Sequence, residues 1–95
     1  MLEIKKFELG LVVTTIGIHA EIQDNEKFGA EIFRALARYT NGDWGEIPKE
    51  DKATNEEAIR DEFRVFAGYK TSKGKIWIIT EADRSVTTIL FPKEY

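Results

Sequence analysis

The chain of 95 residues contains no cysteine, which excludes disulfides, thiolate metal sites and cysteine nucleophiles. Its one histidine, His19, has no neighbouring partner for acid–base chemistry. No apolar run approaches the roughly 20 residues that span a bilayer, and the first residues lack the apolar core of a signal peptide. From these absences we expect a cytoplasmic protein with no membrane association, no cofactor, no catalytic residues and no metal site.

Concentrated positive charge is also lacking. The formal net charge is −3 and no dense basic run occurs. Phosphate backbones are bound by clustered lysine and arginine, so nucleic-acid binding is expected only through a local patch. The balance favours a protein partner. The content of 42% apolar residues is enough for one modest core, and the length predicts a single domain over residues 1–95.

The first half of the chain predicts a strand and then helices. Residues 9–15 are rich in β-branched side chains, as is typical of a strand. Residues 16–24 fit a strand or a short helix, and we favour the helix. Residues 27–39 carry apolar side chains at helical spacing and are followed by Asn41-Gly42, which suits a helix end. Thr54-Asn55-Glu56-Glu57 has the form of a capping box and predicts the start of a second helix, with Ala58, Ile59 and Phe63 on its apolar face.

The second half changes to strand-like patterns. Residues 65–69 alternate, residues 71–74 suit a hairpin loop, and residues 76–79 are apolar on both faces, which is typical of a central strand. Residues 86–91 form a third strand that Pro92 ends. The predicted fold is α+β, with two or three helices packed on one face of a three- to four-stranded, mainly antiparallel sheet that ends in a C-terminal β-meander.

Two polar loops carry the candidate partner-binding residues. In the first, the Asp43-Trp44 pair lies between two glycines, and Trp44 is either an exposed anchor for a partner or a buried ring in a tight turn; we favour the turn. In the second, Arg84 with Glu81 and Asp83 forms either a binding loop or an internal Asp–Arg pair. Two pairs of arginines have helical spacing: Arg34 with Arg38, and Arg60 with Arg64. They line either an arginine-lined groove or a solvated helix surface, and we favour the solvated surface.

The Gly42-Asp43-Trp44-Gly45 loop and the block from Trp77 to Thr88 (WIITEADRSVTT) resemble a group of small uncharacterised bacterial proteins. These are described as plasmid-related and occur on plasmids and conjugative elements. The resemblance covers the chain from about Leu9 to Tyr95. It implies a mobile-element context and no established activity.

Two functional hypotheses follow. The first is a non-enzymatic protein-interaction module that modulates a host-defence or plasmid-maintenance factor and contacts its partner through Asp43, Trp44, Glu81, Asp83 and Arg84. The second, on a weak analogy of fold, is an endoribonuclease of the barnase/RelE-like toxin class, with Arg64, Tyr69, Arg84 and Thr88 as candidate active-site residues. An exposed edge strand would also allow two copies to pair as a homodimer.

Overall fold

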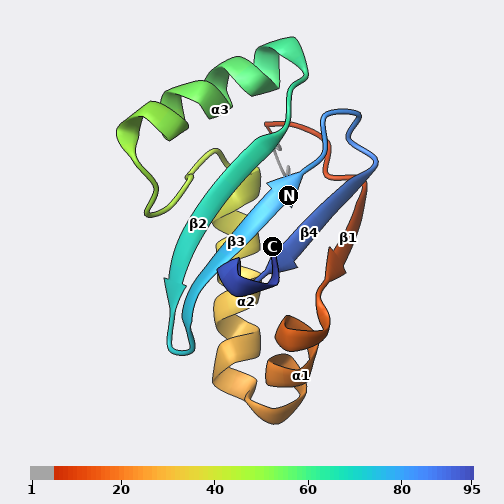
Figure 1. The fold of residues 1–95 in the computed structure, drawn as a ribbon, viewed down its shortest axis with the longest axis vertical. Helices are drawn as coiled ribbons and strands as arrows, with labels where there is room; N and C mark the ends of the chain where they lie inside the picture. Colours follow the sequence, from red (N-terminus) through yellow and green to blue (C-terminus); the bar gives the residue numbers. More distant parts are fainter. Residues whose placement is uncertain (1–5) are drawn as a thin grey trace, which may run out of the picture.

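In the computed structural model, which describes residues 6–95, one mixed sheet has α2 packed against one face and the C-terminal turn against the other (Figure 1). The elements, in chain order, are β1 (Leu11–Thr14), α1 (Ile16–Asp24), α2 (Glu26–Thr40), α3 (Lys49–Asp61), β2 (Val65–Thr71), β3 (Gly74–Thr80), β4 (Val86–Leu90) and the 3-10 turn η1 (Pro92–Glu94). The four strands lie in the order β1-β4-β3-β2. The predicted α+β class is confirmed.

The ambiguous residues 16–24 form a helix, as favoured. Thr15 caps α1, since its hydroxyl oxygen accepts from the N–H of Ile18. The carboxylate of Glu94, from η1, accepts from the Thr15 hydroxyl at 2.6 Å and from the N–H of Gly17 at 3.0 Å. A side chain at Gly17 would place its Cβ 2.6 Å from that carboxylate. The far end of the chain therefore completes the N-terminal cap of α1.

The amphipathic helix predicted over residues 27–39 is α2. Asn25 caps it by accepting from the N–H of Phe28 at 3.1 Å. Its buried side chains recur at three- and four-residue spacing and face the sheet: Phe28, Ile32, Ala35 and Tyr39. Burial of this stripe, rather than helix propensity, fixes α2 on the sheet.

The start predicted for the next helix is wrong. α3 begins at Lys49, directly after Pro48, and not near Thr54. Proline is compatible with a helix start, and Glu50 and Asp51 place negative charge in the first turn, where the helix dipole favours it. Thr54 lies inside the helix and donates to Glu50 O at 3.0 Å. The predicted apolar face also fails at Phe63, which lies after the helix and is exposed.

The C-terminal meander is confirmed. β2 and β3 pair antiparallel through a tight turn at Gly74 (φ +102°), and β4 pairs antiparallel with β3, which makes β3 central. β1 adds to the far side of β4 in parallel register, with Leu11 opposite Val86 and Thr14 opposite Ile89. The last strand of the meander, β4, is therefore covered by β1, which lies more than 70 residues earlier in the chain.

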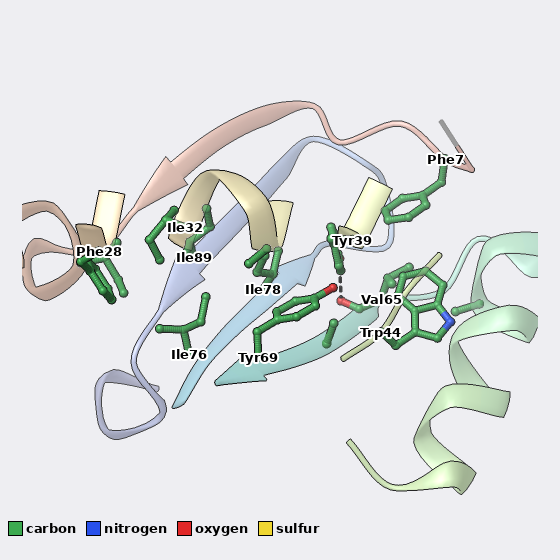
Figure 2. Close-up of a cluster of buried hydrophobic side chains, with 14 residues drawn as sticks. Phe7, Phe28, Ile32, Tyr39, Trp44, Val65, Tyr69, Ile76, Ile78 and Ile89 are labelled. Atoms are coloured by element: carbon green, nitrogen blue, oxygen red, sulfur yellow. Dashed lines mark hydrogen bonds between the residues drawn. The ribbon is translucent and has the colours of Figure 1, made fainter. Parts of the chain in front are cut away.

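The core lies between α2 and the sheet (Figure 2). Tyr39 of α2 is fully buried there, beside the ring of Trp44 at a centroid distance of 5.7 Å. Its hydroxyl lies 2.7 Å from the hydroxyl of Thr80, which lies 2.7 Å from that of Thr87. Thr87 in turn donates to Leu9 O at 2.7 Å. This chain of hydrogen bonds satisfies the buried polar groups of three elements.

Candidate functional site

Arg84, a predicted partner-binding residue, holds two backbone segments together. Its Nη1 donates to the carbonyl oxygens of Phe63 (2.7 Å), Glu81 (3.2 Å) and Ala82 (3.2 Å), and its Nη2 donates to Ala58 O at 3.0 Å. The guanidinium thus joins the C-terminal end of α3 to the connector between β3 and β4. The proposed Asp–Arg pair is wrong, because Arg84 binds carbonyl oxygens instead.

The two acidic residues of the same connector lie nearer the solvent. Asp83 accepts from the N–H of Ser85 at 3.0 Å, and hydrogen bonds from Ser85 lower the pKa of Asp83 below its ordinary value. Glu81 lies 3.9 Å from Arg64. Asp83 shapes the turn, and Glu81 belongs to the surface charges beside β2. The structure therefore gives Glu81, Asp83 and Arg84 different partners within the chain, and their role in partner binding stays a prediction.

The loop from Asn41 to Glu46 is a tight turn, as favoured. Trp44 is only 4% exposed, and its Nε1 donates to Glu56 of α3 at 2.9 Å. The interpretation of Trp44 as an exposed anchor is therefore wrong. Asp43 accepts from Arg38 at 2.8 and 3.2 Å, and its pKa is lowered mainly by this hydrogen bond. Asp43 also accepts from the N–H of Gly45 at 3.1 Å, so its carboxylate holds the turn.

The outer edge of β2 is closed by other parts of the chain. The side-chain amide of Asn55, 3% exposed, accepts from the N–H of Phe66 and donates to its carbonyl. The carbonyl of Gly68 accepts from the N–H of Glu46 at 2.7 Å, and the Glu46 carboxylate accepts from the N–H of Lys70 at 2.8 Å. Successive outward-facing backbone groups of β2 therefore have partners, and this edge is protected from pairing with another strand.

The opposite edge of the sheet differs. β1 is the terminal strand, and the N–H groups of Leu11 and Thr15 donate toward β4, to the carbonyl oxygens of Ser85, just before that strand, and of Ile89. Because ladder partners alternate along a strand, the backbone groups of Val12 and Thr14 point outward. Leu11 is 69% and Ile16 is 88% exposed. No charged residue occurs from Leu9 to Ile18. We call this surface, made of Leu11, Val12, Thr14 and Ile16, the β1 edge.

The sheet face opposite α2 carries aromatic rings and an arginine; we call it the open face. Trp77 packs edge-on against Phe66 (5.1 Å between centroids) and Tyr95 (5.8 Å). Arg64 donates to the hydroxyl of Tyr95 at 2.8 Å and lies over its ring. These four residues, with Ile79, line a pocket of about 250 Å³. Figure 1 shows η1, which leads to Tyr95, on this side of the sheet.

A second pocket, of about 580 Å³, lies where α1, the β2–β3 hairpin and η1 meet. Lys73, Lys75 and Lys93 line it, together with Glu21 and Glu94. Lys73 lies 3.9 Å from Glu21. The Glu94 carboxylate is occupied by its hydrogen bonds to the start of α1. Within residues 6–95, Lys75 and Lys93 form no ion pair.

The four residues considered for a ribonuclease site are not brought together. Tyr69 is buried on the α2 side of the sheet, where its hydroxyl donates to Asp43 O at 2.7 Å and burial raises its pKa far above the ordinary value. Arg64 lies on the open face. Thr88 also points to that face, because it follows Thr87 in β4 and the Thr87 side chain is buried on the α2 side. Arg84 is held by backbone carbonyls at the end of α3. No common reaction site joins them.

The two arginine pairs do not line one groove, because they lie on different elements and point to different partners. Arg38 of α2 binds Asp43, and Arg60 of α3 lies 3.8 Å from Asp61. Arg64 lies on the open face, on the other side of the sheet from α2. The favoured interpretation as balanced surface charge therefore fits these contacts.

No protein-family model, curated protein or solved structure matches the chain. The resemblance to plasmid-related proteins therefore stays a prediction. In the part of the chain that the structure describes, no three histidine, aspartate or glutamate side chains converge as metal ligands. No described helix is both long enough and apolar enough to cross a membrane.

Sequence reasoning allowed for an exposed edge strand but did not assign it to β1, and it missed the open face as a surface. The alternation of Lys75, Trp77 and Ile79 along β3 is a signal for one shared face, and the uncharged run from Leu9 to Ile18 is a signal for an unprotected strand. The roles of Asn55 and Glu94 had no local signal, since each bonds to residues that only folding brings near.

Proposed function

We propose that this chain is a non-enzymatic interaction module that binds an extended segment of a partner protein along the β1 edge. The observation that carries this is the difference between the two edges of the sheet. The β2 edge is closed by Asn55 and by the loop before α3, whereas the β1 edge presents outward backbone groups beside Leu11 and Ile16. A strand added to such an edge gains main-chain hydrogen bonds and side-chain contacts at alternate positions.

A non-enzymatic role has support from the placement of the reactive side chains. The phenols of Tyr39 and Tyr69 are buried, and burial raises the pKa of each. Groups that transfer protons need a pKa near the working pH and access to substrate. The guanidinium of Arg84, the strongest candidate for stabilising a developing anion, is engaged by carbonyl oxygens.

The length of β1 favours a different protein over a second copy as the occupant. β1 has four residues and extends about 13 Å, so two copies paired through it share only that length. Stable interfaces bury roughly 1,200–2,000 Å². A longer extended segment can continue past β1 and cover Ile16 as well. Because the edge is uncharged, we expect alternating apolar residues in the partner segment.

The biological setting belongs to the same proposal. Modulation of a host-defence or plasmid-maintenance factor by a mobile-element protein is supported by the sequence resemblance alone. The proposed contact residues change from the earlier set, because Trp44 is buried and Arg84 is engaged. Leu11, Val12 and Ile16 take their place.

Selection of binders from a random peptide library, with peptides about ten residues long, tests the proposal. We expect enriched peptides that alternate apolar residues and lose at least about tenfold in affinity on Val12→Pro, which removes an outward N–H, or on Leu11→Lys. Phe63→Lys is the matched control, because Phe63 is also an exposed apolar residue but follows α3, which packs beside β2 at the other edge of the sheet. Failure to enrich any peptide over the Val12→Pro protein would contradict the proposal.

Light scattering of the free protein tests whether the β1 edge binds a second copy of the chain instead of a different protein. We expect a monomer whose mass does not change on Val12→Pro. A dimer that this substitution dissociates would instead assign the edge to a second copy of the chain. Circular dichroism of both variants checks that loss of binding is not loss of fold.

A further inference from the structure

The net charge of −3 conceals a separation of charge along the chain. Residues 63–80, which contain the β2–β3 hairpin, include basic side chains and no acidic one: Arg64, Lys70, Lys73 and Lys75. The same segment supplies Phe66 and Trp77 to the open face. Acidic residues gather instead on α3, at Glu50, Asp51, Glu56, Glu57 and Asp61. The hairpin is therefore a local basic surface on an acidic protein.

The two pockets of this surface are neighbours along β3. Lys75 lines the larger pocket and Trp77 the smaller. They are two residues apart on one strand and share a face, at a spacing of about 7 Å. Gly68 of β2 lies opposite Trp77, and a Cβ there would come within 3.4 Å of the Trp77 ring and 3.5 Å of Lys75 Cε. Both side chains therefore lie beside the same glycine on one face of the sheet, so lysine and ring form one surface.

We infer that the open face binds single-stranded nucleic acid, with bases packed against Trp77 and Tyr95 and phosphates near Lys75, Lys93 and Arg64. This inference is independent of the β1 edge and concerns a different surface. Proteins that bind single strands without sequence preference combine a basic path for the backbone with aromatic side chains for the bases. Here the larger pocket places Lys75 and Lys93 on one side of the aromatic rings. Arg64 lies beside the same rings in the smaller pocket.

The acidic groups on this surface already have partners. Glu21 lies near Lys73, Glu81 lies near Arg64, and Glu94 accepts from the start of α1. Lys75 and Lys93 carry positive charge without an ion pair among the described residues. They are therefore the side chains best placed to meet phosphates.

The aromatic rings favour a single strand over the alternatives. Bases in a duplex are stacked on one another and present only their edges, so they cannot pack on Trp77. An acidic peptide would use the lysines but would gain little from Tyr95. A single strand uses both features at once.

Fluorescence anisotropy with a labelled single-stranded oligonucleotide of mixed sequence, as DNA and as RNA, tests the inference. We expect a Kd of about 1–100 µM at low salt. Contacts to about three phosphates predict a slope of log K against log salt of about −2. The double variant Lys75→Glu/Lys93→Glu should reduce the slope to about −0.7 and weaken binding at least about tenfold at low salt. Lys6→Glu/Lys27→Glu is the matched control with the same change in net charge, because Lys27 lies on α2 and the Lys6 side chain lies beside Gly42, after the end of α2.

A separate substitution tests whether bases pack on the aromatic rings. Tyr95→Ala should weaken binding about fivefold or more without removing a charged residue, whereas Phe33→Ala, which also removes an exposed ring, should leave it unchanged. No binding at low salt would overturn the inference. Equal affinity for a duplex or for polyglutamate would also overturn it, since neither offers unstacked bases. Loss of oligonucleotide binding in the Lys6→Glu/Lys27→Glu control would show non-specific charge attraction and overturn it as well.

Discussion

Arg84→Ala should destabilise the fold, because the guanidinium joins α3 to the β3–β4 connector. Four hydrogen bonds are lost, to Ala58, Phe63, Glu81 and Ala82. Ala58 O keeps the N–H of Phe63 as a partner, and the connector carbonyls lie near solvent, so part of the loss is replaced. A hydrogen bond to a charged group contributes roughly 1.5–3 kcal/mol. With this compensation we expect a loss of about 2–3 kcal/mol.

The positive φ of Arg84 does not change this expectation. The residue has φ +61°, and alanine meets the same left-handed strain because it also has a Cβ. Arg84→Lys keeps the charge but loses the planar fork of donors, so we expect about half of the destabilisation.

Urea unfolding followed by tryptophan fluorescence measures the effect, since the chain has two tryptophans, of which Trp44 is buried. A loss of 2–3 kcal/mol corresponds to a fall in Tm of roughly 10–20 °C for a domain of this size. Arg60→Ala is the control, because the Arg60 side chain is 70% exposed and its ion pair with Asp61, at 3.8 Å, is a surface pair. A loss below about 0.5 kcal/mol, equal to that of the control, would refute the structural role of Arg84.

Two further predictions concern Asn55, which closes the β2 edge, and Asp43, which holds the turn before α3. Asn55→Ala removes the buried amide that bonds the N–H and carbonyl of the half-buried Phe66 and should cost about 2–3 kcal/mol in urea unfolding, with faster amide exchange at Phe66. The exposed Glu57→Ala should change little. The pKa of Asp43 is lowered by its hydrogen bond to Arg38, so its stabilisation is present above the ordinary pKa and is lost as pH falls through the lower folded value. Asp43→Asn should therefore be less stable than wild type at pH 7 but lose less stability between about pH 5 and pH 2; an equal loss in both proteins would contradict the assignment.

Regular local patterns predicted most of the elements. Apolar residues at helical spacing predicted α2, and the run apolar on both faces predicted a central β3. Gly74 predicted the hairpin turn, because its conformation is open mainly to glycine. The capping-box prediction at Thr54 failed because Pro48 and the acidic residues after it begin the helix one turn and more earlier.

The candidate site was predicted less well than the fold. Trp44 and Arg84 are residue types common at binding surfaces, but one is buried and the other binds backbone carbonyls. Composition cannot separate these roles, because an arginine with carbonyl partners and one facing solvent have the same sequence context. The exposed residues of the β1 edge, Leu11 and Ile16, instead resemble ordinary core residues in the sequence.

The sequence by itself determined the class of fold, the meander and the amphipathic face of α2, since each depends on residues a few positions apart. The tertiary structure alone decided that β1 pairs in parallel with β4 as the terminal strand, that Asn55 closes the β2 edge of the sheet, and that Glu94 caps α1. These contacts join residues 11 to 79 positions apart. They depend on which surfaces meet when the whole core forms, and no local pattern encodes that meeting.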